Sequence, residues 1–210
     1  MFKVGGFKKI GKKKIIFLII IILLLLIGGV FWWQDRETPI EKWEAAKVSP
    51  KEDYMIKETP EGKIVENKKM GLTYEIPQDW ILENENPTRF YSPDTKFKEE
   101  TGFVIPERGC KIDVYASYIK TNLDTLKKFI DAEFLKSSPV TKLDEFSTIK
   151  VGNYSALRHK YRLDKFGISS ILVDFPSKGK LYRILLSSPI GERERCEEEL
   201  NKFLETISID

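Results

Sequence analysis

The chain has 210 residues, with 35 Lys and Arg against 32 Asp and Glu, which gives a formal net charge of +3. The two signs are unevenly placed. Residues 1–33 contain six lysines and no acid, so residues 34–210 hold the other 29 bases and all 32 acids. This mildly acidic body argues against nucleic acid as a partner. With 41% hydrophobic and 12% aromatic residues, the chain as a whole is not disordered.

An uncharged apolar segment follows the basic start of the chain. Residues 15–33 read IIFLIIIILLLLIGGVFWW. As a helix this segment is about 28 Å long, close to the ~30 Å of a bilayer's hydrocarbon layer. Trp32 and Trp33 end it, and tryptophan rings favour the membrane interface. We therefore predict a transmembrane helix over 15–33, which makes membrane lipid an expected partner.

The charges around this segment predict its orientation. The basic residues before it are all lysines: Lys3, Lys8, Lys9, Lys12, Lys13 and Lys14. The positive-inside rule then predicts a cytoplasmic tail over 1–14 and a single-pass protein of the plasma (inner) membrane, with residues 34–210 outside the cytoplasm. A cleaved signal peptide is the alternative. It requires small residues at the cleavage site, and the bulky residues after Gly29 favour a retained anchor.

Residues 34–68 are rich in charge, poor in apolar residues and contain Pro39, Pro50 and Pro60. This composition indicates a stalk that holds a domain away from the bilayer. The alternative is that the second half of the stretch pairs as an edge strand of that domain.

Residues 69–210 have the patterns of one folded domain. Strands are predicted where apolar residues alternate or cluster between turns: Leu72–Ile76, Trp80–Leu82, Thr88–Tyr91, Lys111–Ile119, Glu145–Val151, Tyr154–Leu163, Ile168–Phe175 and Leu181–Leu186. Charges and glycines indicate a long loop over 94–109, around the apolar piece Phe103–Ile105. The segment 176–180 is expected to be a hairpin loop.

Two helices complete the predicted domain. The first begins at Thr121 or Asn122, carries apolar residues at helical spacing and ends near Pro139. The second covers Glu192–Ile207. Strands outnumber helices and do not alternate with them, so we predict an α+β fold. Its mainly antiparallel sheet is flanked by helices on both faces.

Four short motifs in this region resemble the PsbP-like superfamily, which comprises photosystem-II extrinsic proteins and their bacterial relatives. They are GLTYEIPQDW at 71–80, FYSPD at 90–94, NLDTL at 122–126 and KLYRI at 180–184. The resemblance covers about residues 69–209. It implies an antiparallel sheet between helices and a non-enzymatic accessory or binding role, and it transfers no functional residue.

The two cysteines, Cys110 and Cys196, suggest a structural role. Disulfides persist outside the cytoplasm, and this pair would join a predicted central strand to the apolar face of the terminal helix. Such a bond stabilises by about 4 kcal/mol on the chain-entropy model. The alternative is two free thiols, either both buried or one of them exposed, because pairing geometry cannot be derived from sequence.

Groups suited to catalysis are few. The single histidine, His159, lies in a predicted strand between Arg158 and Lys160, which indicates a solvent-exposed side chain. A sortase-type transpeptidase would pair it with a cysteine, but the glutamates beside Cys196 disfavour a thiolate. We therefore predict no catalytic, metal or cofactor site. The expected function is a non-catalytic binding or accessory module of the cell envelope that recognises a protein or a small ligand. The alternative is an envelope enzyme with a noncanonical Cys/His site.

Overall fold

The computed structural model describes residues 47–100, 103–134, 140–142 and 146–210. The predicted tail, the apolar segment with Trp32 and Trp33, and the first part of the predicted stalk lie outside these residues. In the portion that the structure describes, no helix is both long enough and apolar enough to cross a membrane. The description below therefore concerns the unit that begins at Trp43.

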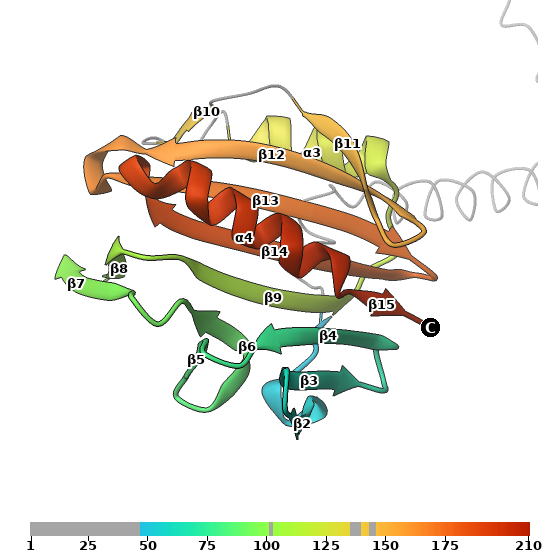
Figure 1. Ribbon diagram of the computed structural model, residues 1–210. Helices are drawn as coiled ribbons and strands as arrows, with labels where there is room; N and C mark the ends of the chain where they lie inside the picture. The colour runs from blue at the N-terminus through green and yellow to red at the C-terminus, as the bar shows by residue number, and fades with distance from the viewer. Residues whose placement is uncertain (1–46, 101–102, 135–139, 143–145) are drawn as a thin grey trace, which may run out of the picture. The chain divides into compact units, whose positions relative to one another are not determined.

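A nine-stranded antiparallel sheet forms the body of the domain (Figure 1). Its strands follow in the spatial order β10 (Val140–Lys142), β12 (Tyr154–Leu163), β13 (Ile168–Ser177), β14 (Lys180–Pro189), β9 (Lys111–Tyr118), β6 (Asn86–Tyr91) and β5 (Ile81–Glu83). Two further strands join it from the side: β1 (Lys47–Val48) pairs with β9, and β11 (Ser147–Val151) pairs with β12.

The hairpin between β13 and β14 is tighter than its sequence suggests. Ser177 and Lys180 still pair, so only Lys178 and Gly179 form the turn instead of the predicted five-residue loop. Both have positive φ, 49° and 77°. That combination is the type I′ turn, whose twist matches that of paired strands.

The two α-helices of the described residues cover opposite faces of the sheet. Helix α4 (Arg193–Glu205) buries Leu200, Phe203 and Leu204 in the core that contains Val114, Val173 and Ile184. Helix α3 (Leu123–Phe134) packs Leu126 and Ile130 against Leu157 and Leu181, which lie on the other face. The Asn122 side chain accepts a hydrogen bond from the Thr125 N–H at 2.9 Å, so Asn122 caps α3. The predicted antiparallel sheet between helices is confirmed.

A second, four-stranded sheet adds to the α4 side of the core. Its order is β15 (Ser208–Ile209), β4 (Leu72–Pro77), β3 (Gly62–Asn67) and β2 (Met55–Thr59), and a short 3-10 helix, η1 (Lys51–Asp53), precedes it. Val65, Tyr74 and Ile76 are fully buried there. The terminal β15 pairs with β4, so the C-terminal end of the chain lies in the same sheet as β2, β3 and β4.

This sheet corrects the predicted boundary at residue 69. Residues 47–67 are part of the domain, as the alternative to a stalk anticipated, and they supply more than one strand. The charged residues of β2 are exposed at the edge of the sheet. The neighbouring strand β3 has Val65 and Asn67 in buried positions. A surface-exposed edge strand has the same composition as a linker, which explains the error.

The predicted loop over 94–109 is also corrected. Strands β7 (Lys96–Glu100) and β8 (Phe103–Arg108) pair as a separate two-stranded hairpin. The hairpin places Ile105 and Pro106 in buried positions although its sequence is mostly charged. It projects from the same side of the domain as the β12–β13 connection, which contains the 3-10 helix η2 (Asp164–Phe166) (Figure 1).

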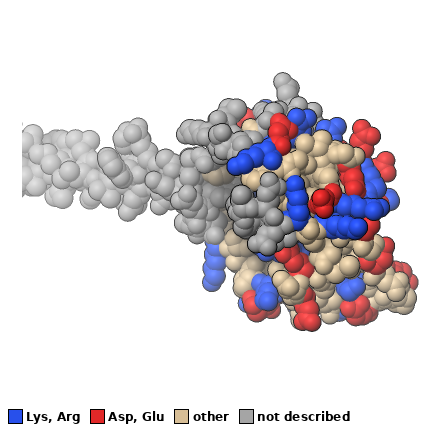
Figure 2. Space-filling view, turned by 90° about the vertical axis from the view of Figure 1, so that its left-hand side faces the viewer, with Lys and Arg blue, Asp and Glu red and all other residues tan. Residues whose placement is uncertain are grey.

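Charges of both signs are mixed on the face of the domain that Figure 2 shows. Figure 2 shows Lys and Arg side chains interspersed with Asp and Glu on the visible face, without a large patch of one sign. This agrees with the near balance of charge over 34–210 and gives no electrostatic argument for a nucleic-acid partner.

Candidate functional site

A cavity of about 340 Å³ lies on the α3 side of the main sheet. We call it the sheet pocket. Its polar lining residues are Lys111, Asp113, Tyr161, Ser170 and Ser187. They come from four adjacent strands and share one face because their positions are opposite one another in the register. Ser170 pairs with both Tyr161 and Ser187, and Ser187 pairs with Lys111.

Apolar side chains form the walls of the sheet pocket. They are Ile105 and Pro106 of β8, Leu163 and Phe166 at the end of β12 and in η2, Ile168 of β13 and Leu185 of β14. The volume lies within the roughly 300–1,000 Å³ of small-molecule sites. Apolar walls around a polar floor suit a small amphiphilic ligand with a hydrogen-bonding head group.

The floor of the sheet pocket holds a small charge network. The Lys111 Nζ lies 2.8 Å from Glu83 Oε2 and 3.8 Å from Asp113 Oδ1, and the Arg89 Nε lies 3.5 Å from the same Asp113 oxygen. Asp113 is only 6% exposed. Burial raises the pKa of its carboxyl group, although the neighbouring Lys111 and Arg89 act in the opposite direction. A buried group with a shifted pKa in a cavity is a common mark of a functional site.

Sequence analysis missed this site because its residues are spread over strands far apart in the chain. The alternation on β9 does contain a signal. Ile112 and Val114 point into the core on the α4 side, so Lys111 and Asp113 must point to the opposite face. Two charged residues on the inner face of a central strand indicate a polar site or a buried ion pair.

His159 does not have the exposed position that we predicted. It is 3% exposed and lies on the α3 side of β12, with its ring centroid 5.3 Å from that of Phe146 and 5.9 Å from that of Tyr161. Its neighbours Arg158 and Lys160 point to the other face, where both form ion pairs of 2.8 Å with Glu197 of α4. Flanking charges therefore misled the prediction, since alternation separates them from His159.

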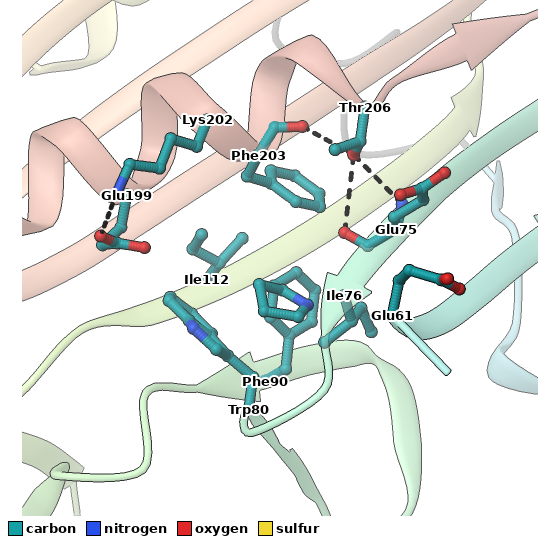
Figure 3. A pocket seen from close by; sticks show the side chains of 11 residues that line it. Glu61, Glu75, Ile76, Trp80, Phe90, Ile112, Glu199, Lys202, Phe203 and Thr206 are labelled. Atoms are coloured by element: carbon teal, nitrogen blue, oxygen red, sulfur yellow. Dashed lines mark hydrogen bonds and ion pairs between the residues drawn. The ribbon is translucent and has the colours of Figure 1, made fainter. Parts of the chain in front are cut away.

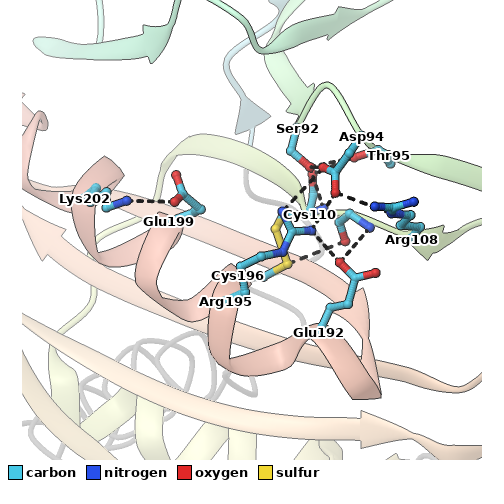
Figure 4. Close-up of a disulfide and its surroundings, with 11 residues drawn as sticks. Ser92, Asp94, Thr95, Arg108, Cys110, Glu192, Arg195, Cys196, Glu199 and Lys202 are labelled. Atoms are coloured by element: carbon cyan, nitrogen blue, oxygen red, sulfur yellow. Dashed lines mark hydrogen bonds and ion pairs between the residues drawn. A yellow bond between two sulfur atoms is a disulfide. The ribbon is translucent and has the colours of Figure 1, made fainter.

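Cys110 and Cys196 form a disulfide with a Cα–Cα distance of 5.4 Å, which decides between the two alternatives for these residues (Figure 4). The bond joins the residue just before β9 to the first turn of α4 across 86 residues of sequence, and both cysteines are fully buried. Because both sulfur atoms are bonded, neither is the thiolate nucleophile that the transpeptidase hypothesis requires.

Polar contacts reinforce the disulfide at the start of α4 (Figure 4). The Ser92 Oγ accepts a hydrogen bond from the Cys110 N–H at 3.0 Å and donates one to Asp94 Oδ1 at 2.7 Å. The Arg195 guanidinium lies 3.1 Å from Asp94 Oδ2 and also pairs with Glu192. The hydrogen bond from Ser92, followed by the charge of Arg195, lowers the pKa of Asp94. Together with the disulfide, these contacts hold the start of α4 against the segment 92–110.

In the part of the chain that the structure describes, there is no group of three or more His, Cys, Asp or Glu side chains that could hold a metal ion.

Comparison with known proteins gives matches among solved structures alone. No protein-family model matches the chain. No curated protein matches its sequence.

Three of the matching solved structures have the following sequence identities, TM-scores and coverages. Cyanobacterial PsbP (CyanoP) from Synechocystis sp. PCC 6803 has 14% sequence identity and a TM-score of 0.45, covering 75% of this chain and 93% of its own. LpqN of Mycobacterium tuberculosis, described as involved in cell envelope biogenesis, has 15% identity and a TM-score of 0.47, covering 79% and 91%. The Ran-binding protein Mog1p of Saccharomyces cerevisiae has 12% identity and a TM-score of 0.43, covering 74% and 96%. The matches thus include a PsbP protein, and the likeness concerns the fold.

Proposed function

We propose that this chain is a membrane-anchored, non-catalytic binding module of the cell envelope, and that its extracytoplasmic domain binds a small amphiphilic ligand in the sheet pocket. The observation that carries the proposal is the sheet pocket itself. It combines charged and hydroxyl groups, among them the buried Asp113 and Ser170, with apolar walls in a cavity of ligand size.

Two features support the proposed location. The uncharged segment 15–33 follows six lysines, which favours an anchor with a cytoplasmic N-terminus. The buried disulfide suits a domain that matures in an oxidising compartment. Neither feature depends on the sheet pocket, so location and ligand can be tested separately.

The location is tested by protease protection. The outer layers of the cells are permeabilised while the plasma membrane is left intact. Protease added to these cells should degrade the domain that contains residues 47–210. Degradation only after the membrane has been lysed would place the domain in the cytoplasm and contradict the proposal.

The ligand is tested by native mass spectrometry of the full chain, purified from its own membranes in an uncharged detergent. We expect an added mass from a co-purified small molecule. The substitution Ser187→Phe fills the sheet pocket and should abolish that mass. Ser147→Phe, at an exposed position on β11, is the matched control and should retain it. An added mass that persists in Ser187→Phe, or its absence from the natural protein, would contradict the assignment.

A further inference from the structure

A second cavity lies on the opposite side of the main sheet, between α4 and β4 (Figure 3). Its volume is about 220 Å³. Three aromatic residues, Trp80, Phe90 and Phe203, form its floor, and three glutamates, Glu61, Glu75 and Glu199, stand around its mouth. We call it the acidic aromatic pocket.

The aromatic floor is held in place by its own packing. The ring centroid of Phe90 lies 5.7 Å from that of Trp80 and 5.3 Å from that of Phe203. All three side chains are at least nine-tenths buried, so only small parts of their rings meet the cavity. Aromatic rings offer apolar contact and a negative face, which together suit a cation carried on an apolar stem.

The mouth of the pocket has an excess of negative charge. Among the described residues that line it, Lys202 is the one cation, and it donates a hydrogen bond to Glu199 at 2.8 Å, so these two charges balance. Nearby, the Lys63 ammonium donates instead to the Gln78 carbonyl at 3.5 Å. Within the described part of the chain, Glu61 and Glu75 form no ion pair. Both are exposed, which leaves two carboxylates available at the rim.

The two walls of the pocket are tied together next to these carboxylates. The Glu75 N–H donates to Thr206 Oγ1 at 3.1 Å, and the Thr206 hydroxyl donates to the Phe203 carbonyl at 2.8 Å (Figure 3). These bonds join β4 to the end of α4. Because the opening is fixed from both sides, a ligand does not have to order it.

The size of the cavity limits what enters. Its volume is below the roughly 300 Å³ at which small-molecule sites begin, so it suits one side chain better than a whole cofactor. A side chain with an apolar stem and a cationic end matches the aromatic floor and the acidic rim together.

We propose that the acidic aromatic pocket binds a lysine or arginine side chain presented by a partner protein. The apolar stem packs against Trp80 and Phe203, and the cation lies between Glu61 and Glu75. This site is on the other face of the sheet from the sheet pocket, and the proposal stands or fails independently of the ligand proposed there.

Trp80 provides a direct reporter. The chain has four tryptophans, and replacing Trp32, Trp33 and Trp43 with phenylalanine leaves Trp80 alone. The full chain with these three substitutions, in an uncharged detergent, is titrated with Nα-acetyl-arginine amide and Nα-acetyl-lysine amide while Trp80 fluorescence is recorded. Nα-acetyl-glutamine amide is the neutral control probe, and putrescine represents a free cation.

We expect a saturable fluorescence change with the arginine or lysine probe and none with the glutamine probe. Glu61→Gln and Glu75→Gln should each weaken binding by about fivefold, the factor for two unit charges ~4 Å apart in water. Glu52→Gln and Glu58→Gln, each made singly, are the controls. Each makes the same change in net charge at an exposed position outside the pocket lining and should have little effect on binding. Lys202→Gln releases Glu199 and should tighten binding.

Equal responses to the arginine and glutamine probes would overturn the proposal, as would unchanged binding in both rim variants. Tighter binding of putrescine than of either amino-acid probe would assign the pocket to a small free cation and overturn the protein partner.

Discussion

Arg183 of β14 binds the carboxylate of Asp174 on β13 through two hydrogen bonds, from Nε to Oδ1 at 2.8 Å and from Nη2 to Oδ2 at 3.0 Å. The two residues are directly opposite in the register, and Asp174 is completely buried. A charged pair therefore lies on the α3 side of the sheet, with its carboxylate completely buried and its guanidinium partly exposed. Burial raises the pKa of Asp174, and Arg183 counteracts that shift.

Replacing Arg183 with methionine should destabilise the domain strongly, because Asp174 then stays buried without its cation. We expect the free energy of unfolding to fall by about 3–5 kcal/mol in urea titrations. Adding Asp174→Leu to Arg183→Met should recover much of this loss of stability. Replacing a buried ion pair with an apolar pair of similar volume often leaves the free energy of unfolding unchanged. Arg162→Met is the control: its pair with Asp164 is largely exposed, so its loss should have a much smaller effect on stability. Additive effects of the two main substitutions would contradict the interpretation.

The disulfide should contribute measurably to stability. Replacing both Cys110 and Cys196 with serine should lower the free energy of unfolding by about 4 kcal/mol, because the bond closes a loop of 86 residues. Reductant should shift the urea midpoint of the natural protein in the same direction and leave that of the double variant unchanged. Two alkylated thiols in the protein isolated without reductant would show that the bond is not formed in the cell.

Two aspartates should affect the acid stability of the domain with opposite signs. The pKa of Asp94 is lowered in the folded state, so its stabilising contribution is present above its unfolded pKa and is lost as the pH falls. The pKa of Asp113 is raised, so its contribution is present below its unfolded pKa and is lost as the pH rises through the folded value.

These signs predict a difference between two variants in unfolding experiments across pH 3–6. Relative to the natural protein, Asp94→Asn should lose stability as the pH rises, whereas Asp113→Asn should gain it. Parallel pH profiles for the two variants would show that one of the assigned shifts is wrong.

The early strands should be required for folding, which is most sharply tested at Asn67. This side chain is fully buried, donates to Ser49 Oγ at 2.8 Å and accepts from the Met70 N–H at 3.1 Å. Asn67→Ala leaves these groups without that partner and should cost about 1–3 kcal/mol. Asn201→Ala, at an exposed position on α4, is the matched control and should change stability by less than about 1 kcal/mol.

A truncated chain gives a second test of the same boundary. A protein that begins at residue 69 lacks β1, β2 and β3 and should fail to unfold cooperatively, whereas one that begins at residue 43 should retain the transition. A cooperative transition in the shorter protein would restore the boundary predicted from sequence.

Most of the fold was predictable because local patterns carry it. The alternation along β9, β12 and β14 predicts strands, and apolar spacing predicts α3 and α4. Such patterns depend on residues two, three or four positions apart, which a sequence displays directly. The prediction was wrong where burial does not follow composition: the charged strands β2 and β7 pair although their sequences resemble linkers, and His159 is buried although both of its neighbours in sequence are charged.

The sequence by itself determined the split of charge between residues 1–33 and the rest, the expectation of an anchor, and the alternation of sheet and helix faces. Only the tertiary structure decided that Cys110 and Cys196 are bonded, that Lys111 and Asp113 share a pocket with Ser170 and Ser187, and that Glu61 and Glu75 line one pocket with Trp80. The reason is physical. Cys110 and Cys196 are 86 residues apart, and the residues of each pocket come from separate strands and helices. Strand register and helix packing, which arise from the whole core, bring these elements together, and no local sequence pattern relates them.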